Sequence, residues 1–513
     1  MIDSRSTDVP QHLSANRIEW RPVVITLAFF TVLSAWMAVA SKGFLEADGI
    51  THYLARRFAL NEPLHLVGVW SRPLCVAMYA LPAQLGGLVG VRLTSLFLTI
   101  ILAALTLAVA RQSRIGRPSL AVVFLLTQPL LFAHSFSELT EIPFALMLIA
   151  GFWAYQCRWF FLLAVIAALC PLARPEGFGL LVVVGVALIL HRKWWWIAIL
   201  PLGLLAWTYA GWRAFGGPDA YPWYTWLPRN WPYSGESMYG SGSPFWFVIV
   251  LPAIVGPLAF PVIGFGAWAM IRFGTFGGGW ADRFKAAANL FWNNHAYRCR
   301  LLLAIIPIGV LIGHSVLWTF GKMASSGEPR YLLIVAPFWA LLAAAGWQGV
   351  VRRLHLKHAF RPLIAAAVLP IAINFFYPAF PIRAQAEDAL AVEVRAWLAE
   401  RPEVEAAYPK LAASLPHLFI QMDIDRLNYD RVVDSSQKTV KHPPPGVMLV
   451  WDTIYSTHNA SAEYCVTDTL LAENGWVPAA VFRQRDKVAT VYLSPTDAAG
   501  NSTPMLEATR LFE

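Results

Sequence analysis

The sequence predicts a polytopic α-helical membrane protein with about eleven transmembrane helices and a soluble C-terminal α/β domain. Of its 513 residues, 57% are hydrophobic and only 14% are charged, whereas average soluble domains carry about 25% charged residues. Apolar runs long enough to cross a bilayer recur as far as residue 377, and beyond that point charged residues become frequent. We therefore divide the chain into a membrane domain at 1–380 and a soluble domain at 381–513.

The membrane domain is defined by its apolar runs, since a helix needs about 17–25 apolar residues to cross a bilayer. Eight runs of about this length lie near 22–40, 91–110, 177–191, 194–212, 245–271, 301–320, 331–350 and 361–377. Three shorter runs, at 119–133, 142–157 and 159–173, bring the number to eleven if their flanks extend them. The first run lacks a convincing signal-peptide cleavage site, so we expect it to stay in place as a span.

Basic residues between the runs predict the topology, because Lys and Arg collect in cytoplasmic loops. With a cytoplasmic N-terminus, the basic loops fall inside; they contain Arg111/Arg114/Arg117, Arg158, Arg192/Lys193, Arg283/Lys285/Arg298/Arg300 and Arg352/Arg353/Lys357. The C-terminal domain then lies outside the cytoplasm, and a bacterial inner or cell membrane is the expected location. Counting the apolar stretch at 73–90 as a span would invert every later loop. We interpret that stretch as a re-entrant or interfacial segment broken at Pro82 and Gly86-Gly87.

Net charge and cysteine content narrow the class of protein further. The net charge is +9, but most basic residues lie between apolar runs and are explained by topology, so nucleic-acid binding is not expected. The five cysteines show no metal-ligand spacing, and four of them lie in or beside apolar runs, which is typical of small buried residues.

The C-terminal domain shows both helical and strand patterns. Residues 384–400 have helical spacing and helix-forming residues. Short β-rich runs lie at 446–452, 477–482 and 488–493, and Pro478 favours an edge strand for the second of them. A domain of about 130 residues can form its own hydrophobic core.

A polar stretch after the first span contains acids, a histidine and arginines, which are residue types that can form a catalytic site. In Glu46-Ala-Asp48-Gly-Ile-Thr-His52-Tyr-Leu-Ala-Arg56-Arg57, a helix would place Asp48, His52 and Arg56 on one stripe beside an apolar strip. Such a helix can lie at the interface and direct its acids into a cavity, or it can be a solvated helix whose charges pair with each other.

Further acids also fall on the side predicted to be outside. They are Glu138, Glu141, Glu176 and Glu328, and each lies at the mouth of a span. Glu176 follows Arg174 in Arg174-Pro-Glu-Gly, and Glu328 precedes Arg330-Tyr331. Each one alone is better explained as a helix cap or a solvated loop acid. Their common side favours a functional interpretation.

These residues resemble the GT-C class of membrane glycosyltransferases, which use polyprenyl-phosphate-linked sugars. The resemblance is strongest over 44–110, where the Glu46–Arg57 stretch is followed by Trp70-Ser-Arg-Pro-Leu74. Weaker similarity lies in Ser137-Glu-Leu-Thr-Glu141-Ile-Pro, Ala173-Arg-Pro-Glu-Gly177 and Glu328-Pro-Arg-Tyr331. The class includes protein O-mannosyltransferases and the aminoarabinose transferase of lipid A. Its common Asp-Glu pair appears here as Glu46-x-Asp48, so either acid can take the family's acidic role.

The resemblance implies an inverting transfer from a polyprenyl-phosphate sugar to a lipid, glycan or protein acceptor. The departing lipid phosphate needs no general acid, unlike the leaving group of a glycosidase. One carboxylate must accept the acceptor's proton, and a cation must compensate charge on the phosphate. We assign Asp48 as the base, with Glu46 as the alternative, and Arg330 as the phosphate-binding cation.

The remaining candidate residues are assigned to substrate binding: His52, Arg57, Glu141, Arg174, Glu328 and Tyr331. For His52, a structural role as the partner of Asp48 is slightly favoured, because this single His has no metal-ligand companion. The ring-rich segment 221–233 could stack on sugar or line a prenyl groove, or it could form an interfacial aromatic belt. No cofactor is required by the sequence; a Mg²⁺ at Asp48 is compatible with the chemistry, but the leaving group does not demand it.

Two other functions fit a membrane protein of this composition. A secondary transporter or lipid flippase would place ionisable groups near the bilayer midplane, often in two related halves. This sequence shows neither feature clearly, since its acids lie at the ends of spans. A membrane anchor for a catalytic C-terminal domain is the third alternative, but that domain shows no recognisable catalytic constellation.

Overall fold

The computed structural model describes residues 18–215, 221–233, 235–237, 239–271, 280–354, 380–457 and 462–503. The chain forms two compact units. The first contains residues 1–40 and 65–380, and the second contains residues 41–64 and 381–513. The polar stretch after the first span is therefore grouped with the C-terminal residues.

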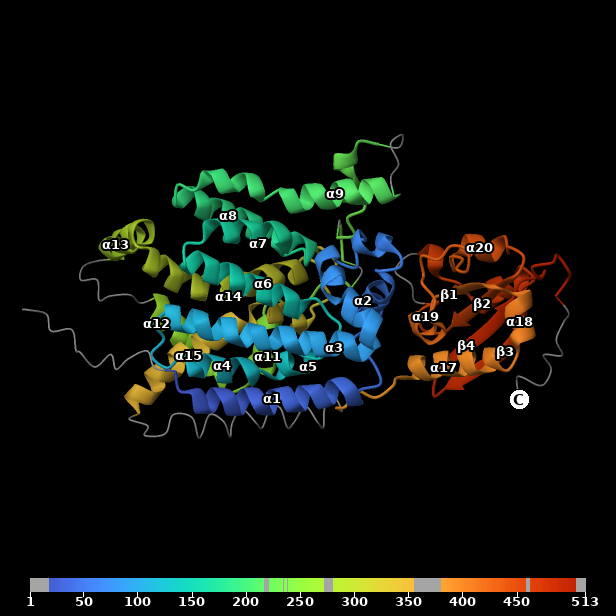
Figure 1. Cartoon of the computed structure of the whole chain (residues 1–513), viewed down its shortest axis with the longest axis horizontal. Helices are drawn as coiled ribbons and strands as arrows, with labels where there is room; N and C mark the ends of the chain where they lie inside the picture. Colours follow the sequence, from blue (N-terminus) through green and yellow to red (C-terminus); the bar gives the residue numbers. More distant parts are fainter. Residues whose placement is uncertain are drawn as a thin grey trace, which may run out of the picture. The chain divides into compact units, whose positions relative to one another are not determined.

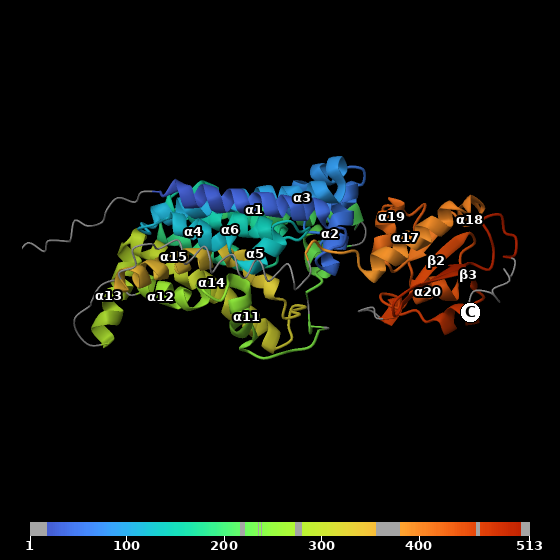
Figure 2. The same cartoon turned by 90° about the horizontal axis from the view of Figure 1, so that it is seen from below.

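The first unit is a bundle of apolar helices, which lie side by side in Figures 1 and 2. Its α-helices are α1 (Trp20–Ala40), α3 (Pro73–Gln112), α4 (Ser119–Leu126), α5 (Pro129–His134), α6 (Glu141–Gln156), α7 (Phe160–Leu169), α8 (Gly177–Leu190), α9 (Leu202–Phe215), α10 (Trp226–Arg229), α11 (Trp246–Val255), α12 (Ala259–Ile271), α13 (Trp280–Asn293), α14 (His295–Thr319) and α15 (Ala336–Arg353). Short 3₁₀ helices are η1 (Pro63–Leu66), η2 (Cys170–Leu172), η3 (Trp194–Ile199), η4 (Trp223–Thr225) and η5 (Pro329–Val335).

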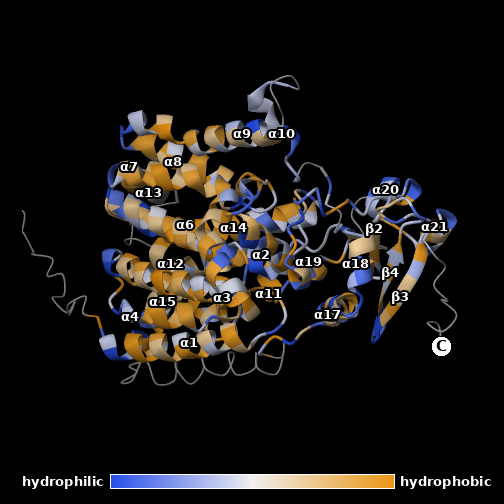
Figure 3. Cartoon of the chain, turned by 45° about the vertical axis from the view of Figure 1, so that its right-hand side comes forward, coloured by the Kyte–Doolittle hydropathy of each residue, from blue (hydrophilic) through white to orange (hydrophobic). Residues whose placement is uncertain are grey.

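Five helical stretches among the described residues are long and apolar enough to cross a membrane. A sixth forms if α11 and α12, which meet at 107°, are one broken span. The hydrophobic colouring of these helices in Figure 3 fits a polytopic helical membrane protein. The predicted number of eleven spans is not confirmed, because α6, α7 and α8 are shorter than a full span and the run at 361–377 lies outside the described residues.

Burial divides the spans into outer and central helices. On α1, Val32 and Val39 are exposed, as expected of side chains that face lipid rather than protein. On α15, eleven residues are buried, including Phe338 and Trp339. Both helices belong to stretches that are apolar enough to cross a membrane, and packing distinguishes the central helix from the outer one.

The helix α3 is broken at Gly86-Gly87, as the sequence predicts, but the predicted break at Pro82 is wrong. Gly87 has a non-helical backbone (φ 55°, ψ −143°) within α3. A Cβ built on Gly90 would lie 2.2 Å from the Pro82 carbonyl oxygen, whereas residues eight apart in a straight helix are separated by about 12 Å. The chain therefore bends sharply at Gly87, and the helix continues through Pro82.

Glycines bring α12 and α15 into close contact. A Cβ on Gly266 would lie 1.8 Å from the Leu342 carbonyl oxygen, and one on Gly346 would lie 1.9 Å from the Val262 carbonyl oxygen. Small residues allow helix backbones to approach in this way within membranes.

We expect Gly266→Val to separate these helices and to destabilise the protein by about 1–3 kcal/mol, the usual cost of overpacking. The melting temperature of the purified protein in detergent measures the effect. Gly264→Val is the matched control on the same helix, because a Cβ on Gly264 meets no atom within 4 Å. Equal melting temperatures for the two variants would contradict the prediction.

The second unit is built on a four-stranded mixed sheet of order β1-β2-β4-β3. Its strands are β1 (Lys410–Ala413), β2 (Val447–Asp452), β3 (Val477–Gln484) and β4 (Lys487–Leu493), and its helices are α2 (Ala47–Phe58), α17 (Ala386–Ala399), α18 (Pro402–Ala407), α19 (Pro416–Met422), α20 (Gln437–Lys441), η6 (Ala462–Tyr464) and α21 (Asp468–Glu473). β1 pairs parallel with β2, and the other pairs are antiparallel.

The three strands predicted from sequence correspond to β2, β3 and β4. Pro478 lies on β3 at the edge of the sheet, as predicted, beside a register shift at Pro478/Ala480. Every residue of β2 is buried, which fits its central place. The sequence did not predict β1, whose four residues are too few to show a pattern.

One buried hydrophobic cluster of the second unit lies on one face of the sheet. Its buried members are Ala412, Val440, Val447, Leu449, Trp451, Val466, Leu471 and Trp476. The Trp451 indole donates to the Val466 carbonyl (2.8 Å), and the Trp476 indole donates to the Val440 carbonyl (3.0 Å). Both indole N–H groups therefore have hydrogen-bond acceptors inside the core, as buried indoles require.

Candidate active site

The first unit contains a buried group of charges that we call the arginine–carboxylate cluster: Glu141, Arg174 and Glu176. Arg174 Nη1 donates to Glu141 Oε1 (2.6 Å) and to Thr140 Oγ1 (3.0 Å). Its Nη2 donates to Glu176 Oε1 (2.9 Å), and its Nε lies 3.2 Å from both Glu176 oxygens. A single guanidinium thus holds two carboxylates from different segments, as its five-donor fork allows.

Local structure explains how these side chains meet. Glu141 is the first residue of α6, and Glu176 immediately precedes α8, so both carboxylates lie at helix N-termini, where the helix dipole favours negative charge. A Cβ on Gly177 would lie 2.3 Å from the Cys170 carbonyl carbon, so only glycine permits the tight turn that follows Glu176.

Two aromatic side chains and a second arginine border the cluster. His314 Nε2 lies 3.6 Å from Glu176 Oε1, and its ring stacks on Tyr331 with centroids 5.1 Å apart. The Arg330 guanidinium lies 6.0 Å from the Tyr331 ring centroid, and its charge acts on Glu141. The Tyr331 hydroxyl pairs with Ser326 Oγ at 2.7 Å.

The charges of this group balance. Glu141 and Glu176 are matched by Arg174 and Arg330, and all four residues are mostly buried. Burial by itself would raise the pKa of Glu176, but the adjacent Arg174 guanidinium outweighs it and holds the pKa of that carboxyl well below its usual range. Glu176 therefore stays ionised at neutral pH, and it is not suited to act as a general base.

Glu141 has one carboxylate oxygen that makes no hydrogen bond with the described residues. Its Oε1 is bound by Arg174, but its Oε2 is buried and has no hydrogen-bond partner among the described residues. A buried carboxylate oxygen without a donor is costly. This atom can accept a hydrogen bond from a hydroxyl or amine of a bound molecule.

Another buried ion pair in the first unit involves Glu138, which lies just before Glu141 in the sequence. Arg92 Nε donates to Glu138 Oε1 at 2.5 Å, and both side chains are almost completely buried. Arg92 belongs to α3, which packs against α6. We interpret this pair as a structural link between α3 and the segment before α6.

The residues predicted on the first loop lie on α2 of the second unit. Asp48 is in the first turn of α2, and Glu46 is its N-cap residue without a side-chain capping bond. His52 and Arg56 are buried, with exposed fractions of 7% and 0%. The predicted helix is therefore present, but the predicted polar stripe of Asp48, His52 and Arg56 is not a solvated face, because two of its three residues are buried.

Arg57 has a specific partner in the second unit. Its Nε and Nη2 donate to the two carboxylate oxygens of Asp423, at 3.2 Å each. The pair is partly exposed, with 27% of the Arg57 side chain and 63% of the Asp423 side chain accessible. Because the fork of Arg57 is already filled by a carboxylate, the residue is a weaker candidate for binding phosphate.

Tyr233, which belongs to the ring-rich segment, binds Arg72, a residue that the sequence did not indicate as a candidate. Arg72 precedes α3 with φ of 64°, and its Nη2 donates to the Tyr233 hydroxyl. Its guanidinium also lies 4.9 Å from the Tyr233 ring centroid, and Tyr233 stacks with Trp70. A positive φ at a non-glycine residue often marks a functional segment.

The structure brings together Glu141, Arg174, Glu328, Arg330 and Tyr331 in the first unit, and Glu46, Asp48, His52 and Arg57 in the second. Sequence reasoning missed His314 and Arg72. His314 could have been found, because it is the only ionisable residue between Leu301 and Phe320 in an apolar run. No group of three or more His, Cys, Asp or Glu side chains in the described part of the chain is arranged to hold a metal ion.

Comparisons with known proteins identify the fold. No family model matches the sequence, and no curated protein matches it. The fold is similar to crystal structures of ArnT from Cupriavidus metallidurans, a GT-C glycosyltransferase. The apo structure gives a TM-score of 0.62 at 12% identity, and the structure bound to undecaprenyl phosphate gives 0.56 at 14%. Both cover 91% of this chain and 97% of the other. The chain therefore has a GT-C fold.

Proposed function

We propose that this GT-C-fold membrane protein is an inverting glycosyltransferase that moves a sugar from a polyprenyl phosphate to an extracytoplasmic acceptor. The observation that carries the proposal is the fold shared with ArnT over nearly the whole length of both chains, including a structure bound to undecaprenyl phosphate. The arginine–carboxylate cluster, a concentration of buried charge in an apolar bundle, supports the same conclusion, since such charge in a membrane is a default sign of a functional site.

The reaction needs one base and one phosphate-binding cation. The acceptor oxygen or nitrogen attacks the anomeric carbon from the face opposite the phosphate, and its proton passes to Asp48, or to Glu46 in the alternative assignment. The bond between the anomeric carbon and the phosphate oxygen breaks with its electron pair, which leaves polyprenyl phosphate. Arg330 compensates the charge that develops on this phosphate.

Arg174 has a different role in this proposal from the one expected from sequence. Its donors are bound by Glu141, Thr140 and Glu176, so it positions these carboxylates. Glu141 presents Oε2 to a sugar or acceptor group. Glu328 and Tyr331 support Arg330, and His52 and Arg57 support the α2 helix that carries Asp48.

The proposed orientation follows the basic loops. The N-terminus is cytoplasmic and the second unit is extracytoplasmic, so polyprenyl-phosphate sugar is used on the outer side of a bacterial inner or cell membrane. The acceptor class is a lipid, glycan or protein.

A lipid flippase is the competing function, and one assay separates the two. Purified protein is reconstituted in vesicles that contain polyprenyl phosphate carrying a radiolabelled sugar, together with a membrane extract as the acceptor source. We expect protein-dependent loss of label from the polyprenyl lipid and release of polyprenyl phosphate. Movement of the intact donor across the bilayer, with no cleavage of the sugar–phosphate bond, would favour the flippase and overturn the proposal.

A further inference from the structure

A second polar group lies at the opposite ends of the helices that carry the arginine–carboxylate cluster. We call it the histidine–arginine cluster: Tyr155, His191, His295 and Arg298. α6 begins at Glu141 and carries Tyr155 in its last turn, and α14 runs from His295 toward His314. α8 has Glu176 as its N-cap residue and His191 as its C-cap residue. Along α6, Glu141 and Tyr155 are 14 positions apart, which corresponds to about 21 Å, and the proposed transfer reaction uses none of the four residues.

Close contacts hold the histidine–arginine cluster together. The Tyr155 hydroxyl lies 3.3 Å from His191 Nε2, and the His191 and His295 ring centroids are 5.1 Å apart. Arg298 Nη2 lies 3.4 Å from His191 Nε2. Its Nη1 donates to the carbonyls of Phe291 and Trp292, at 2.7 Å each.

The charge of Arg298 has no acidic counterpart in the described part of the chain. Only 6% of Arg298 is exposed, no described carboxylate lies within 4.0 Å of it, and its Nε has no hydrogen-bond partner among the described residues. Arg158 adds a second positive charge that acts on both histidines. A buried cation is costly unless an anion compensates it. Arg174 holds two carboxylates, whereas Arg298 holds none among the described residues, so a bound anion would complete its charge balance.

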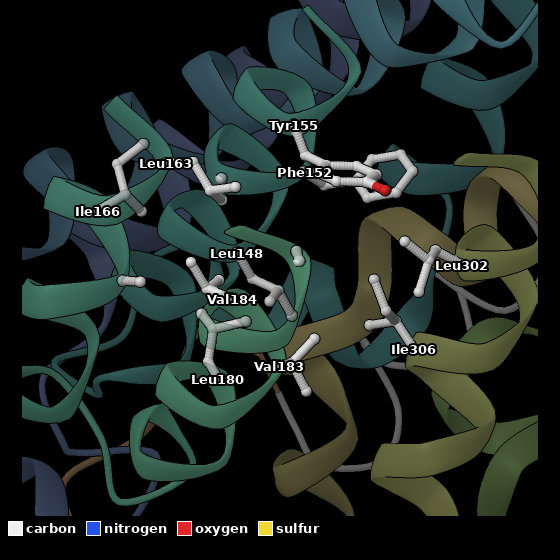
Figure 4. Close-up of a pocket in the computed structure, with 13 residues that line it drawn as sticks. Leu148, Phe152, Tyr155, Leu163, Ile166, Leu180, Val183, Val184, Leu302 and Ile306 are labelled. Carbon is white, nitrogen blue, oxygen red and sulfur yellow. The ribbon is translucent and has the colours of Figure 1, made fainter. Parts of the chain in front are cut away.

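An apolar slot begins at Tyr155 of the histidine–arginine cluster (Figure 4). It lies between α6, α7, α8 and α14 and has an empty volume of about 490 Å³, part of it open to the surface. Its walls include Leu148, Phe152, Leu163, Val184, Leu302 and Ile306. The Tyr155 ring also lines the slot, and its hydroxyl contacts His191, so this side chain joins the slot to the cluster.

The open side of the slot faces outward from the bundle. Val183, which lines it, is 51% exposed, and an exposed apolar residue of a membrane bundle faces lipid chains. A chain of the surrounding bilayer can therefore enter the slot sideways without leaving the membrane.

We propose that the histidine–arginine cluster and the slot form a binding site for one anionic phospholipid, on the side predicted to be cytoplasmic. The headgroup phosphate is bound by Arg298 with hydrogen bonds from His191, and one acyl chain occupies the slot. Charge complementarity selects an anionic lipid, because a zwitterionic headgroup brings its own cation next to Arg298. Basic pockets between transmembrane helices bind lipid headgroups in this way. The site is separate from the transferase reaction, so its test requires no donor and no turnover.

Photocrosslinking tests the proposal. The full-length protein is placed in phosphatidylcholine nanodiscs that contain a trace of phosphatidylglycerol with a diazirine in its acyl chain. Labelled peptides are then identified by mass spectrometry. We expect labelling of α6, α8 and α14 around the slot, and at least about tenfold less labelling in Arg298→Gln and His191→Gln, as loss of a charge-assisted hydrogen bond predicts. Ala187→Phe, which fills the slot one turn before His191, should also lower the labelling.

Lys193→Gln is the matched control, since it removes an exposed cation just after α8 that makes no contact with the cluster. It should label like the wild type. If Arg298→Gln fails to fold, His191→Gln decides the result, because His191 is only partly buried. Equal labelling of wild type and His191→Gln, or equal labelling by a diazirine phosphatidylcholine, would overturn the proposal. Displacement of the probe by inorganic phosphate would also overturn it, since the site would then bind a free anion and not a lipid.

Discussion

Replacing Asp48 with Asn is expected to lower the rate of sugar transfer by about 10²–10⁴-fold, the usual contribution of a positioned general base. Asn keeps the size of the side chain and remains compatible with the first turn of α2. It cannot accept the acceptor's proton in the transition state. The effect should therefore appear in kcat, with a small change in KM for the donor.

The measurement is the release of polyprenyl phosphate from a labelled donor, with thermal melting to verify that the variant is folded. Glu46→Gln is the companion variant, since Glu46 is the N-cap residue of the same helix without a capping bond. Loss of activity in Glu46→Gln alone would transfer the role of base to Glu46. Full activity in both variants would contradict the assignment of the base to this helix.

Arg174→Met is expected to destabilise the protein by about 3–5 kcal/mol, the cost of breaking a buried ion pair by removing one partner. The substitution leaves the Glu141 and Glu176 carboxylates without the guanidinium that binds both of them. Met retains a comparable apolar stem, so loss of packing contributes little. The melting temperature in detergent should fall in proportion to this loss of unfolding free energy.

Arg57→Gln is the control for this effect, because it breaks an arginine–aspartate pair whose Asp423 partner is 63% exposed. Such a pair contributes only about 0–1 kcal/mol. The triple variant Arg174→Met/Glu141→Gln/Glu176→Gln removes the buried charges together and should recover much of the lost stability. Arg174→Met melting at the temperature of Arg57→Gln would refute the interpretation of Arg174 as the centre of a buried ionic cluster.

Several features of the fold could be predicted from local sequence. The break in α3 follows from Gly86-Gly87, whose backbone can adopt a positive φ. The strands β2, β3 and β4 follow from their β-rich runs, and the edge position of β3 follows from Pro478. The number of spans could not be predicted in this way, because hydropathy does not distinguish a short buried helix such as α4 from a helix that crosses the bilayer.

The candidate site was predicted in part. Sequence reasoning identified Glu141, Arg174 and Arg330 by their residue types and their common predicted side. It assigned Arg174 to a substrate, whereas the structure pairs it with Glu141 and Glu176. Which carboxylates an arginine meets depends on how α6 and the turn before α8 pack, and no spacing in the sequence records that packing.

By itself, the sequence determined that the chain is a membrane protein of many apolar helices with a charged C-terminal part, because composition and apolar run length control the transfer of a segment into lipid. Only the tertiary structure decided that Glu46–Arg57 groups with the C-terminal residues, and that Arg57 binds Asp423, 366 positions away in the chain. Only the tertiary structure placed Arg298 beside His191 at the end of an apolar slot. These contacts join residues that are distant in sequence, and the energy of a charge depends on the neighbours that packing gives it.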